Sequence, residues 1–260
     1  MENKLFTIVN KEDEASFLTD LKANTDNFKK KLVLVFGNSE NYIVVNGEKF
    51  LPTPPDPYNG HEYVEIGGLK WATMNIGATS PEQAGLYFAW GETQGYTAEQ
   101  VGSGEGQKYF GWEDYKYGNG TSSPGATGMT KYNSTDGLTT LDAVDDAAVA
   151  NWGGSWRMPT TADFQALGAA VNTAWTQVNN VYGILCTDKT DSSKTLFFPA
   201  VGACNNGSAK SVGNTGYYLS SSLSTRGKLD AGYLLFRSNN TTWNNTGYRY
   251  YGRVVRPVIG

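Results

Sequence analysis

Apolar residues recur at helical spacing in a few stretches and form short runs elsewhere, and this pattern predicts the secondary structure. Thr160 is placed to cap the clearest helix, over residues 160–171, in which Phe164 and Leu167 share one face. A short helix is predicted to start at residues 80–83, and another helix is predicted over residues 141–152. Strands are predicted over residues 63–66, 69–73, 182–187, 195–201, 217–220, 233–237 and 253–258. The pattern therefore predicts an α+β fold whose second half is rich in strands.

The N-terminal part of the chain predicts a separate β-α-β-β-β module. Its strands are expected at residues 5–9, 32–36, 42–45 and 48–51. Asn10 can cap the helix after the first strand, and Asn46-Gly47 is the strongest short signal for a hairpin between the last two. A module of this size has a thin core. It is therefore either self-sufficient or packed against a partner or a second copy of the chain.

A proline-rich segment separates this module from the rest. Prolines at 52, 54, 55 and 57 favour an extended, semi-rigid spacer. All 7 Trp residues lie at or beyond Trp71, so the composition also changes at this point. We therefore predict an anchoring or oligomerisation arm at residues 1–51, a hinge at 52–60 and a large domain at 61–260.

Composition and charge exclude several classes of protein. The 260 residues carry a net charge of −4, which argues against nucleic acid as a partner because phosphate neutralisation needs a basic surface. No apolar run is long enough for a membrane-spanning helix, so we expect no membrane insertion. The residues after Met1 form no recognisable signal peptide. The profile is that of a globular domain rich in loops.

Residues that commonly carry acid–base, redox or metal chemistry are scarce. His61 is the only histidine, although proton transfer near neutral pH usually recruits histidine. The cysteines, Cys186 and Cys204, lack the spacing of a zinc site, and we predict no metal and no cofactor. A disulfide between them remains open. If residues 187–194 connect a hairpin, however, Cys186 should face Leu196 rather than Cys204.

Two other local patterns are weak candidates for ligand sites. The glycine-rich stretch at residues 102–106 has no strand before it and no helix after it, so it lacks the context of a phosphate-binding loop. Asp145 and Asp146 could hold a cation, but we expect a solvated pair on a helix surface.

Five motifs of the large domain occur together in a fixed order. They are GLYFAWGET at 85–93, NWGGSWRMPT at 151–160, FPAVG at 198–202, GYYLSS at 216–221 and GRVVRPV at 252–258. Together they resemble a bacterial and phage family with a C-type lectin fold of the subtype found in formylglycine-generating enzymes. The family includes the variable proteins of diversity-generating retroelements and paralogous surface proteins. The resemblance covers about residues 61–258 and excludes the arm.

The resemblance implies a C-type lectin-like fold in which the motifs act mainly as scaffold. Trp71, Trp90, Trp152 and Trp156 would bury large areas and hold together a domain poor in regular structure. The enzyme relatives need reactive cysteines near the C-terminal region, and none follows Cys204. We therefore expect no enzyme activity.

Residues 219–253 are the predicted binding region. In the strand at 233–237, Leu234 and Phe236 suit the core, while alternate residues point to the other face. The following segment, 238–250, is rich in Tyr and Asn, which are typical of loop recognition surfaces, although an ordinary polar loop is the alternative. The candidate ligand-binding residues are Leu219, Leu223, Tyr233, Leu235, Arg237, Asn239, Asn245, Tyr248 and Tyr250.

In the resembling family, mutation targets adenines in Asn codons. Such changes cannot produce Trp or Lys codons, so Trp243 and Lys228 are expected to be fixed positions or bystanders. The resemblance implies a diversified display protein of a phage tail or a bacterial surface. Its partner would be a protein or glycan receptor on a target cell. A formylglycine-generating-type enzyme and a calcium-dependent sugar-binding lectin are the alternatives.

Overall fold

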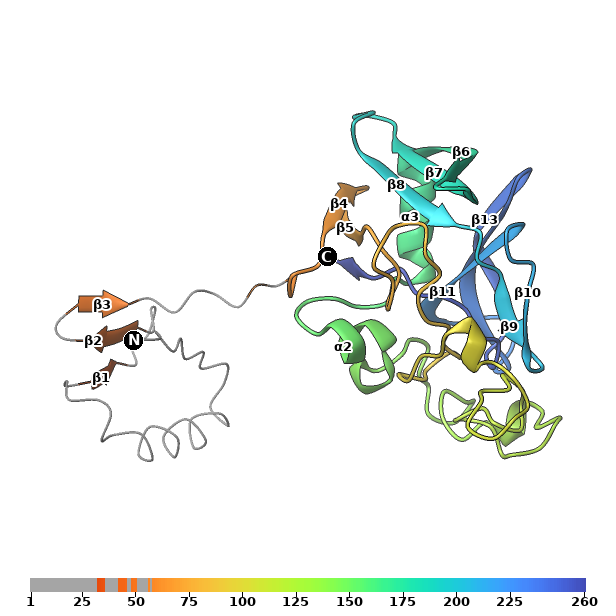
Figure 1. The fold of residues 1–260 in the computed structure, drawn as a ribbon. Helices are drawn as coiled ribbons and strands as arrows, with labels where there is room; N and C mark the ends of the chain where they lie inside the picture. The colour runs from red at the N-terminus through yellow and green to blue at the C-terminus, as the bar shows by residue number, and fades with distance from the viewer. Residues whose placement is uncertain (1–31, 36–41, 46–47, 51–55, 57) are drawn as a thin grey trace. The chain divides into compact units, whose positions relative to one another are not determined.

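A computed structural model describes residues 32–35, 42–45, 48–50, 56 and 58–260 of a chain that divides into two compact units, Met1–Pro57 and Tyr58–Gly260 (Figure 1). The described strands of the first unit are β1 (Leu32–Val35), β2 (Tyr42–Val45) and β3 (Glu48–Phe50), in the antiparallel order β1-β2-β3. Val45 lies opposite Glu48, which confirms the predicted hairpin. The strand predicted at residues 5–9 and the helix after Asn10 lie outside the described residues.

The second unit is an α+β structure built mostly from antiparallel sheets. Its helices are α2 (Ala147–Trp152) and α3 (Thr161–Ala170), with 3-10 turns η2 (Ala98–Gln100), η3 (Ala126–Gly128) and η4 (Ala143–Asp145). Its strands are β4 (Tyr63–Ile66), β5 (Leu69–Ala72), β6 (Val171–Val178), β7 (Val181–Asp188), β8 (Thr195–Pro199), β9 (Ala203–Asn205), β10 (Ser208–Lys210), β11 (Thr215–Leu223), β12 (Asp230–Arg237), β13 (Asn240–Tyr248) and β14 (Val258–Ile259). The sheets have the orders β14-β5-β4, β6-β7-β8, β10-β9 and β11-β12-β13. No helix in the described ranges has the length and apolar character needed to span a bilayer.

Several predicted elements are confirmed. The Thr160 side chain accepts a hydrogen bond from the Asp163 backbone, and the Asp163 carboxylate accepts one from Thr160 N, so a complete capping box starts α3. Strands β4 and β5 form the expected hairpin around Gly67 and Gly68, which have φ of 63° and 81°.

The β7–β8 hairpin is also as predicted. Cys186 lies directly opposite Leu196 across the two strands. Cys186 and Cys204 are both buried and free, so no disulfide joins them.

Other elements differ from expectation. Residues 80–83 form a turn closed by a hydrogen bond of 3.2 Å from Gln83 N to Ser80 O, not a helix. Residues 141–152 divide into η4 and α2 because the Asp146 carboxylate caps α2 and interrupts the helical run.

Four strands, β6, β9, β10 and β13, were not predicted, and one predicted strand is largely absent. Residues 253–258 run extended but pair mainly through isolated bridges to several other segments. Most of the segment 238–250, which was expected to be a loop recognition surface, is strand β13, in which Thr and Trp favour β-structure despite the interspersed Asn residues.

Buried aromatic rings hold the second unit together. Trp71 of β5 stacks on Phe164 of α3 with 5.6 Å between ring centroids, and its other neighbour is Phe198 of β8. Trp90 and Trp156 are also fully buried, and Trp152 is nearly so. The predicted scaffold role of these tryptophans is therefore confirmed by their burial.

The five sequence motifs meet around the C-terminal segment, the one at 198–202 through Phe198, whose ring centroid lies 4.9 Å from the Arg256 guanidinium carbon. Phe88 and Arg253 exchange two backbone hydrogen bonds of 2.9 and 3.0 Å, and Arg157 and Val258 exchange another pair. Leu219 N donates to Val254 O at 2.9 Å.

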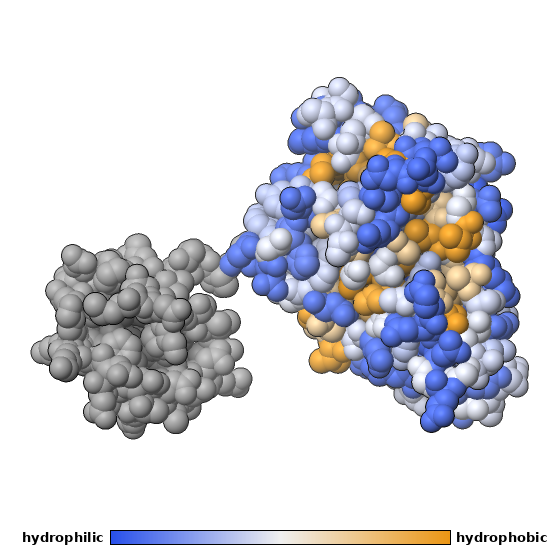
Figure 2. All heavy atoms as spheres, viewed as in Figure 1, coloured by the Kyte–Doolittle hydropathy of each residue, from blue (hydrophilic) through white to orange (hydrophobic). Residues whose placement is uncertain are grey.

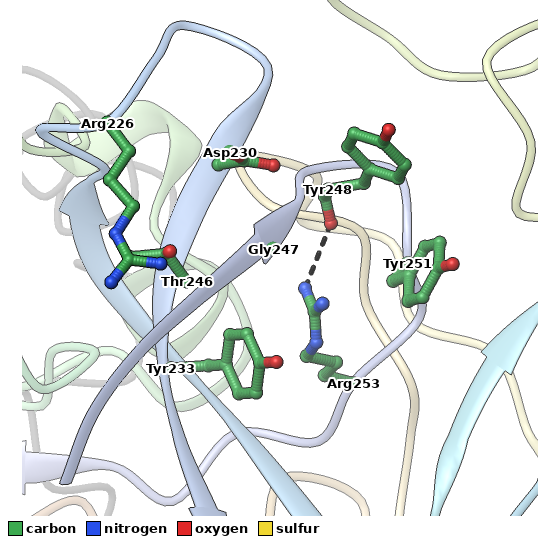
Figure 3. Close-up of a pocket in the computed structure, with 8 residues that line it drawn as sticks. All are labelled: Arg226, Asp230, Tyr233, Thr246, Gly247, Tyr248, Tyr251 and Arg253. Carbon is green, nitrogen blue, oxygen red and sulfur yellow. Dashed lines mark hydrogen bonds between the residues drawn. The ribbon is translucent and has the colours of Figure 1, made fainter. Parts of the chain in front are cut away.

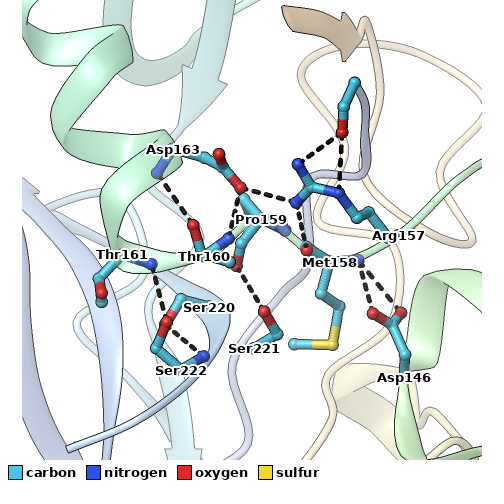
Figure 4. Close-up of polar contacts among 11 residues, drawn as sticks. Asp146, Arg157, Met158, Pro159, Thr160, Thr161, Asp163, Ser220, Ser221 and Ser222 are labelled. Atoms are coloured by element: carbon cyan, nitrogen blue, oxygen red, sulfur yellow. Dashed lines mark hydrogen bonds and ion pairs between the residues drawn. The ribbon is translucent and has the colours of Figure 1, made fainter. Parts of the chain in front are cut away.

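Polar contacts add to these bridges (Figure 4). The Asp146 carboxylate accepts from Met158 N, the Arg157 guanidinium pairs with Asp163, and Ser221 donates to Pro159 O. The motifs are thus joined to one another by main-chain and side-chain bonds.

Candidate functional site

The sheet β11-β12-β13 carries the candidate site. In its β12–β13 hairpin, Tyr233 lies opposite Asn245 and Arg237 lies opposite Asn240, with an irregularity in the register between Tyr233 and Leu235. Two hollows lie at opposite ends of this hairpin, one at the turn and one at the open end where Asp230 pairs with Tyr248. Figure 2 shows apolar residues in separate patches among hydrophilic ones on the face viewed.

The hollow at the open end is here named the tyrosine–arginine pocket. It has a volume of about 340 Å³, near the lower limit for small-ligand sites. Figure 3 shows its lining, which comprises Arg226, Asp230, Tyr233, Thr246, Gly247, Tyr248, Tyr251 and Arg253.

Arg253 is the most deeply buried charged group of this pocket. Its side chain lies between two rings, with the guanidinium carbon 4.2 Å from the Tyr233 centroid and 5.1 Å from the Tyr251 centroid (Figure 3). Nη1 donates to the Tyr248 carbonyl oxygen at 3.0 Å, whereas buried Nε has no hydrogen-bond partner. Burial lowers the pKa of Arg253 from its ordinary value.

Asp230 supplies the carboxylate of the pocket. Among the described residues, no carboxylate oxygen lies within ion-pair distance of Arg253, so Asp230 faces the same cavity without neutralising it directly. Burial raises the pKa of Asp230, and the charges of Arg253 and Arg226 oppose that shift. The pocket thus offers separate positive and negative groups.

The hollow at the hairpin turn is here named the tryptophan hollow. Its volume is about 420 Å³. It is lined by Thr173, Trp175, Ile184, Arg237, Ser238, Asn239, Asn240, Thr241 and Trp243. Trp175 stacks on Tyr182 with 5.7 Å between centroids, and both Trp175 and Trp243 are half-buried. This hollow combines aromatic surface with amide and guanidinium groups, a composition typical of recognition surfaces.

Five predicted binding residues keep exposed surface. Tyr248 is 45% exposed, and Arg237 and Asn239 are exposed at the hairpin turn. Leu235 and Asn245 are half-buried. The tyrosine–arginine pocket includes Tyr248, and the tryptophan hollow includes Arg237 and Asn239.

Four predicted binding residues are buried, contrary to the expectation that they are displayed. Leu219 and Leu223 lie on β11, which is covered on both faces, and Leu219 is 0% exposed. Tyr250 packs against Trp112 with 4.7 Å between centroids. Tyr233 is 8% exposed, with its ring against the Arg253 guanidinium, and it still lines the pocket.

Sequence reasoning missed several residues that line the hollows. Arg253 was assigned to the scaffold as part of the C-terminal motif, and Trp243 was treated as a fixed position or bystander. Trp175 lies on β6, a strand that was not predicted. The sequence did offer a signal for Arg253. It is a charged residue within an apolar run, and such a residue needs a polar partner or a function.

The acidic, histidine and cysteine side chains are the remaining candidates for metal or redox chemistry in the described part of the chain. It contains no group of three or more His, Cys, Asp or Glu side chains that could hold a metal ion. Burial raises the pKa of both Cys186 and Cys204 to about 12, which leaves these thiols protonated and poorly nucleophilic.

The acidic pair was expected to be solvated, and this was wrong. Asp145 and Asp146 are both buried. Asp145 binds Lys116, Lys131 and Tyr132, and Asp146 caps α2, so both carboxylates have structural partners.

Comparisons with known proteins give no relative from which a function could be inferred. No protein-family model, no curated protein and no solved structure matches this chain.

Proposed function

We propose that residues 61–260 have a C-type lectin-like fold of the formylglycine-generating-enzyme subtype. The proposal rests on the five ordered motifs and is supported by the hydrogen bonds that join them, such as those between Phe88 and Arg253 and between Arg157 and Val258. Contacts among distant motifs are expected if the motifs are the shared scaffold of a family.

The function that the site supports best is non-enzymatic ligand binding by a display protein. The observation that carries this proposal is the pair of hollows on one hairpin, lined by Tyr, Asn and Arg, next to a rigid core of buried tryptophans. Tyr and Arg dominate binding energy at interfaces, and a rigid framework lowers the entropic cost of recognition. We propose a receptor-binding part of a phage tail or a bacterial adhesin, whose target is a cell-surface receptor.

The proposal includes diversification of the hairpin by a retroelement. Arg237, Asn239 and Tyr248 tolerate substitution in principle because the core does not depend on them. Leu219 and Leu223 do not fit this scheme, because changes at buried β11 positions would disturb packing. The diversified set is therefore smaller than the sequence predicts and is centred on β12, β13 and their turn.

Sequencing the neighbourhood of the gene tests diversification directly. We expect a reverse-transcriptase gene and a near-repeat of codons 215–256 that differs only at adenines. A neighbourhood without such a repeat, or a repeat with mismatches at all four bases, would contradict this part of the proposal.

Display and scaffold roles can be separated in the full chain by substitution. Tyr248→Ala should reduce the binding of the labelled protein to whole bacterial cells while leaving its melting temperature nearly unchanged. Trp156→Ala should cost roughly 3–5 kcal/mol of unfolding free energy, as for other buried large-to-small changes. Val144→Ala, at a residue 77% exposed, is the matched surface control and should change neither quantity. Equal melting losses for Tyr248→Ala and Trp156→Ala would oppose the division of roles.

A further inference from the structure

Three arginines near the C-terminus are almost fully buried, and one of them differs from the other two. Arg249 donates to the Tyr115 hydroxyl and to three backbone carbonyls. Arg256 donates to the Asn75 side chain and to two backbone carbonyls. Both make several hydrogen bonds within the protein and line neither hollow, although Arg256 Nη2, like Arg253 Nε, is buried without a partner. Their contacts identify them as framework.

Arg253 is 1% exposed and makes a single hydrogen bond, to the Tyr248 carbonyl oxygen. Its Nε is buried without a partner, and it is the one of the three that lines a cavity. A guanidinium has five N–H donors, and leaving buried donors unused is costly. The arrangement is expected where a ligand completes the set.

Gly247 lines the pocket beside this guanidinium, where a side chain would crowd it. A Cβ at Gly247 would lie 3.0 Å from Arg253 Nη2 and 3.2 Å from Tyr233 Cε1. Any larger residue at 247 would therefore press on the guanidinium and the ring that flanks it. The absence of a side chain at this point of β13 therefore lets Arg253 keep its place in the pocket lining.

The remaining lining defines what kind of molecule fits. Tyr233, Tyr248 and Tyr251 present aromatic rings, and Asp230 and Thr246 offer oxygen acceptors. The lining contains two positive charges, on Arg226 and Arg253, and one negative charge, on Asp230, so its net charge is +1. The matching ligand carries one negative charge, several hydroxyl donors and a ring with a face of carbon-bound hydrogens.

We propose that the tyrosine–arginine pocket binds an acidic sugar unit of the target surface, with the sugar carboxylate on Arg253 and the sugar ring against the tyrosines. This inference rests on the proposed ligand-binding function and names its ligand class. A planar carboxylate matches the fork of a guanidinium, and hydroxyl groups of the sugar would donate to Asp230. The face of a pyranose ring packs against an aromatic ring by dispersion.

Other anions fit this lining less well. A phosphate dianion exceeds the single net positive charge and would be repelled by Asp230. An acidic peptide side chain supplies the carboxylate but has no hydroxyl donors for Asp230. These two chemistries are therefore alternatives that the experiment must separate.

The test titrates the full chain with glucuronate and N-acetylneuraminate and follows its intrinsic fluorescence. Glucose, N-acetylglutamate and inorganic phosphate are the comparison ligands. We expect both acidic sugars to bind, to compete with each other and to bind more weakly as salt rises. Glucose should bind at least tenfold more weakly, because it cannot pair with the charge.

Variants locate the binding within the molecule. Gly247→Ala and Arg253→Gln should each weaken glucuronate binding at least tenfold. Gly247→Ala keeps every charge, so it still shows whether glucuronate binds in the tyrosine–arginine pocket if Arg253→Gln does not fold. Gly227→Ala, where an added Cβ meets nothing within 4 Å, is the matched control for the glycine change. Lys210→Gln on exposed β10 is the control for loss of a cation, and both controls should bind normally.

Several results would overturn the inference. They are equal binding of glucose, equal binding of N-acetylglutamate or phosphate, unchanged binding by Gly247→Ala, or no binding of either acidic sugar. If the acidic sugars fail while cell binding still depends on Tyr248, the sugar assignment falls and the display function stands. If cell binding is independent of Tyr248 as well, the proposed function falls with it.

Discussion

At the scale of single residues, Asp145 connects the long, irregular segment before α2 to the rest of the second unit. Its carboxylate accepts from Lys116 Nζ at 2.9 Å, and from Lys131 Nζ and the Tyr132 hydroxyl at 2.7 Å each. Burial alone would raise the pKa of Asp145, but the hydrogen bonds from Lys131 and its other partners hold the pKa well below the ordinary value. The folded state is therefore stabilised by the ionised carboxylate.

Asp145 should make the protein sensitive to acid. A carboxylate with a depressed pKa contributes its full stability above its unfolded pKa, near 4, and loses that contribution as pH falls toward the folded value. We expect the melting temperature to fall from pH 5 to pH 2, with Asp145→Asn less stable at pH 7 and less dependent on pH in this window. Circular dichroism melts over a pH series measure both effects. Glu105→Gln, at an exposed loop carboxylate, should keep the wild-type slope, and a wild-type slope in Asp145→Asn would contradict the assignment.

At the scale of elements, α3 packs against the sheet that carries the hollows. The contact is close because Gly168 has no side chain, and a Cβ there would lie 2.5 Å from the Trp243 ring. Trp243 also lines the tryptophan hollow, so the packing of α3 helps to fix one wall of that hollow. A substitution in the helix can thus act on the candidate binding surface.

Gly168→Ala tests this contact, because the contact determines whether the substitution raises or lowers the free energy of unfolding. Within an open helix the change stabilises by about 1 kcal/mol, because alanine has the higher helix propensity. Here we expect destabilisation, since the Trp243 ring must move or the helix must shift. In a Trp243→Ala background the same change should become stabilising, and denaturant unfolding of all four proteins gives the coupling. A stabilising effect in the wild-type chain would show that the ring moves aside at little cost.

At the scale of the whole molecule, the second unit begins at Tyr58, three residues before the boundary predicted from the sequence. The indole Nε1 of Trp156 donates to Tyr58 O at 2.7 Å, and His61 stacks on Trp152 with 3.6 Å between centroids. Asn59 Nδ2 donates to Trp152 O at 2.5 Å. Part of the expected hinge is therefore integral to the tryptophan core.

Truncation separates a hinge from a structural segment. A chain of residues 56–260 should melt close to the corresponding transition of the full protein, because it retains the whole second unit. A chain of residues 62–260 should be less stable by about 1–3 kcal/mol or more, because the buried Trp156 indole loses its acceptor. Thermal unfolding of the two fragments against the full chain measures the difference. Equal stability of both fragments would show that residues 58–61 do not stabilise the second unit and belong to the hinge.

Several local signals predicted structure correctly, although the helix expected from residue 80 was wrong. The capping box at Thr160, the Gly67-Gly68 hairpin and the opposition of Cys186 and Leu196 each depend on neighbouring residues and strand period. The burial of Leu234 and Phe236 followed from alternation in the same way. Predictions failed where a distant segment covers an element, as at Leu219, whose strand is buried on both faces.

The sequence by itself determined the α+β class, the division near residue 57, the aromatic core and the general location of the candidate binding region, because these follow from periodicity and composition. Only the tertiary structure decided which hairpin residues reach solvent. It also decided that Arg253 lies between two tyrosines with unused donors at a cavity. The physical reason is that burial and pairing of a side chain depend on what packs against it, and those neighbours are far away in the chain.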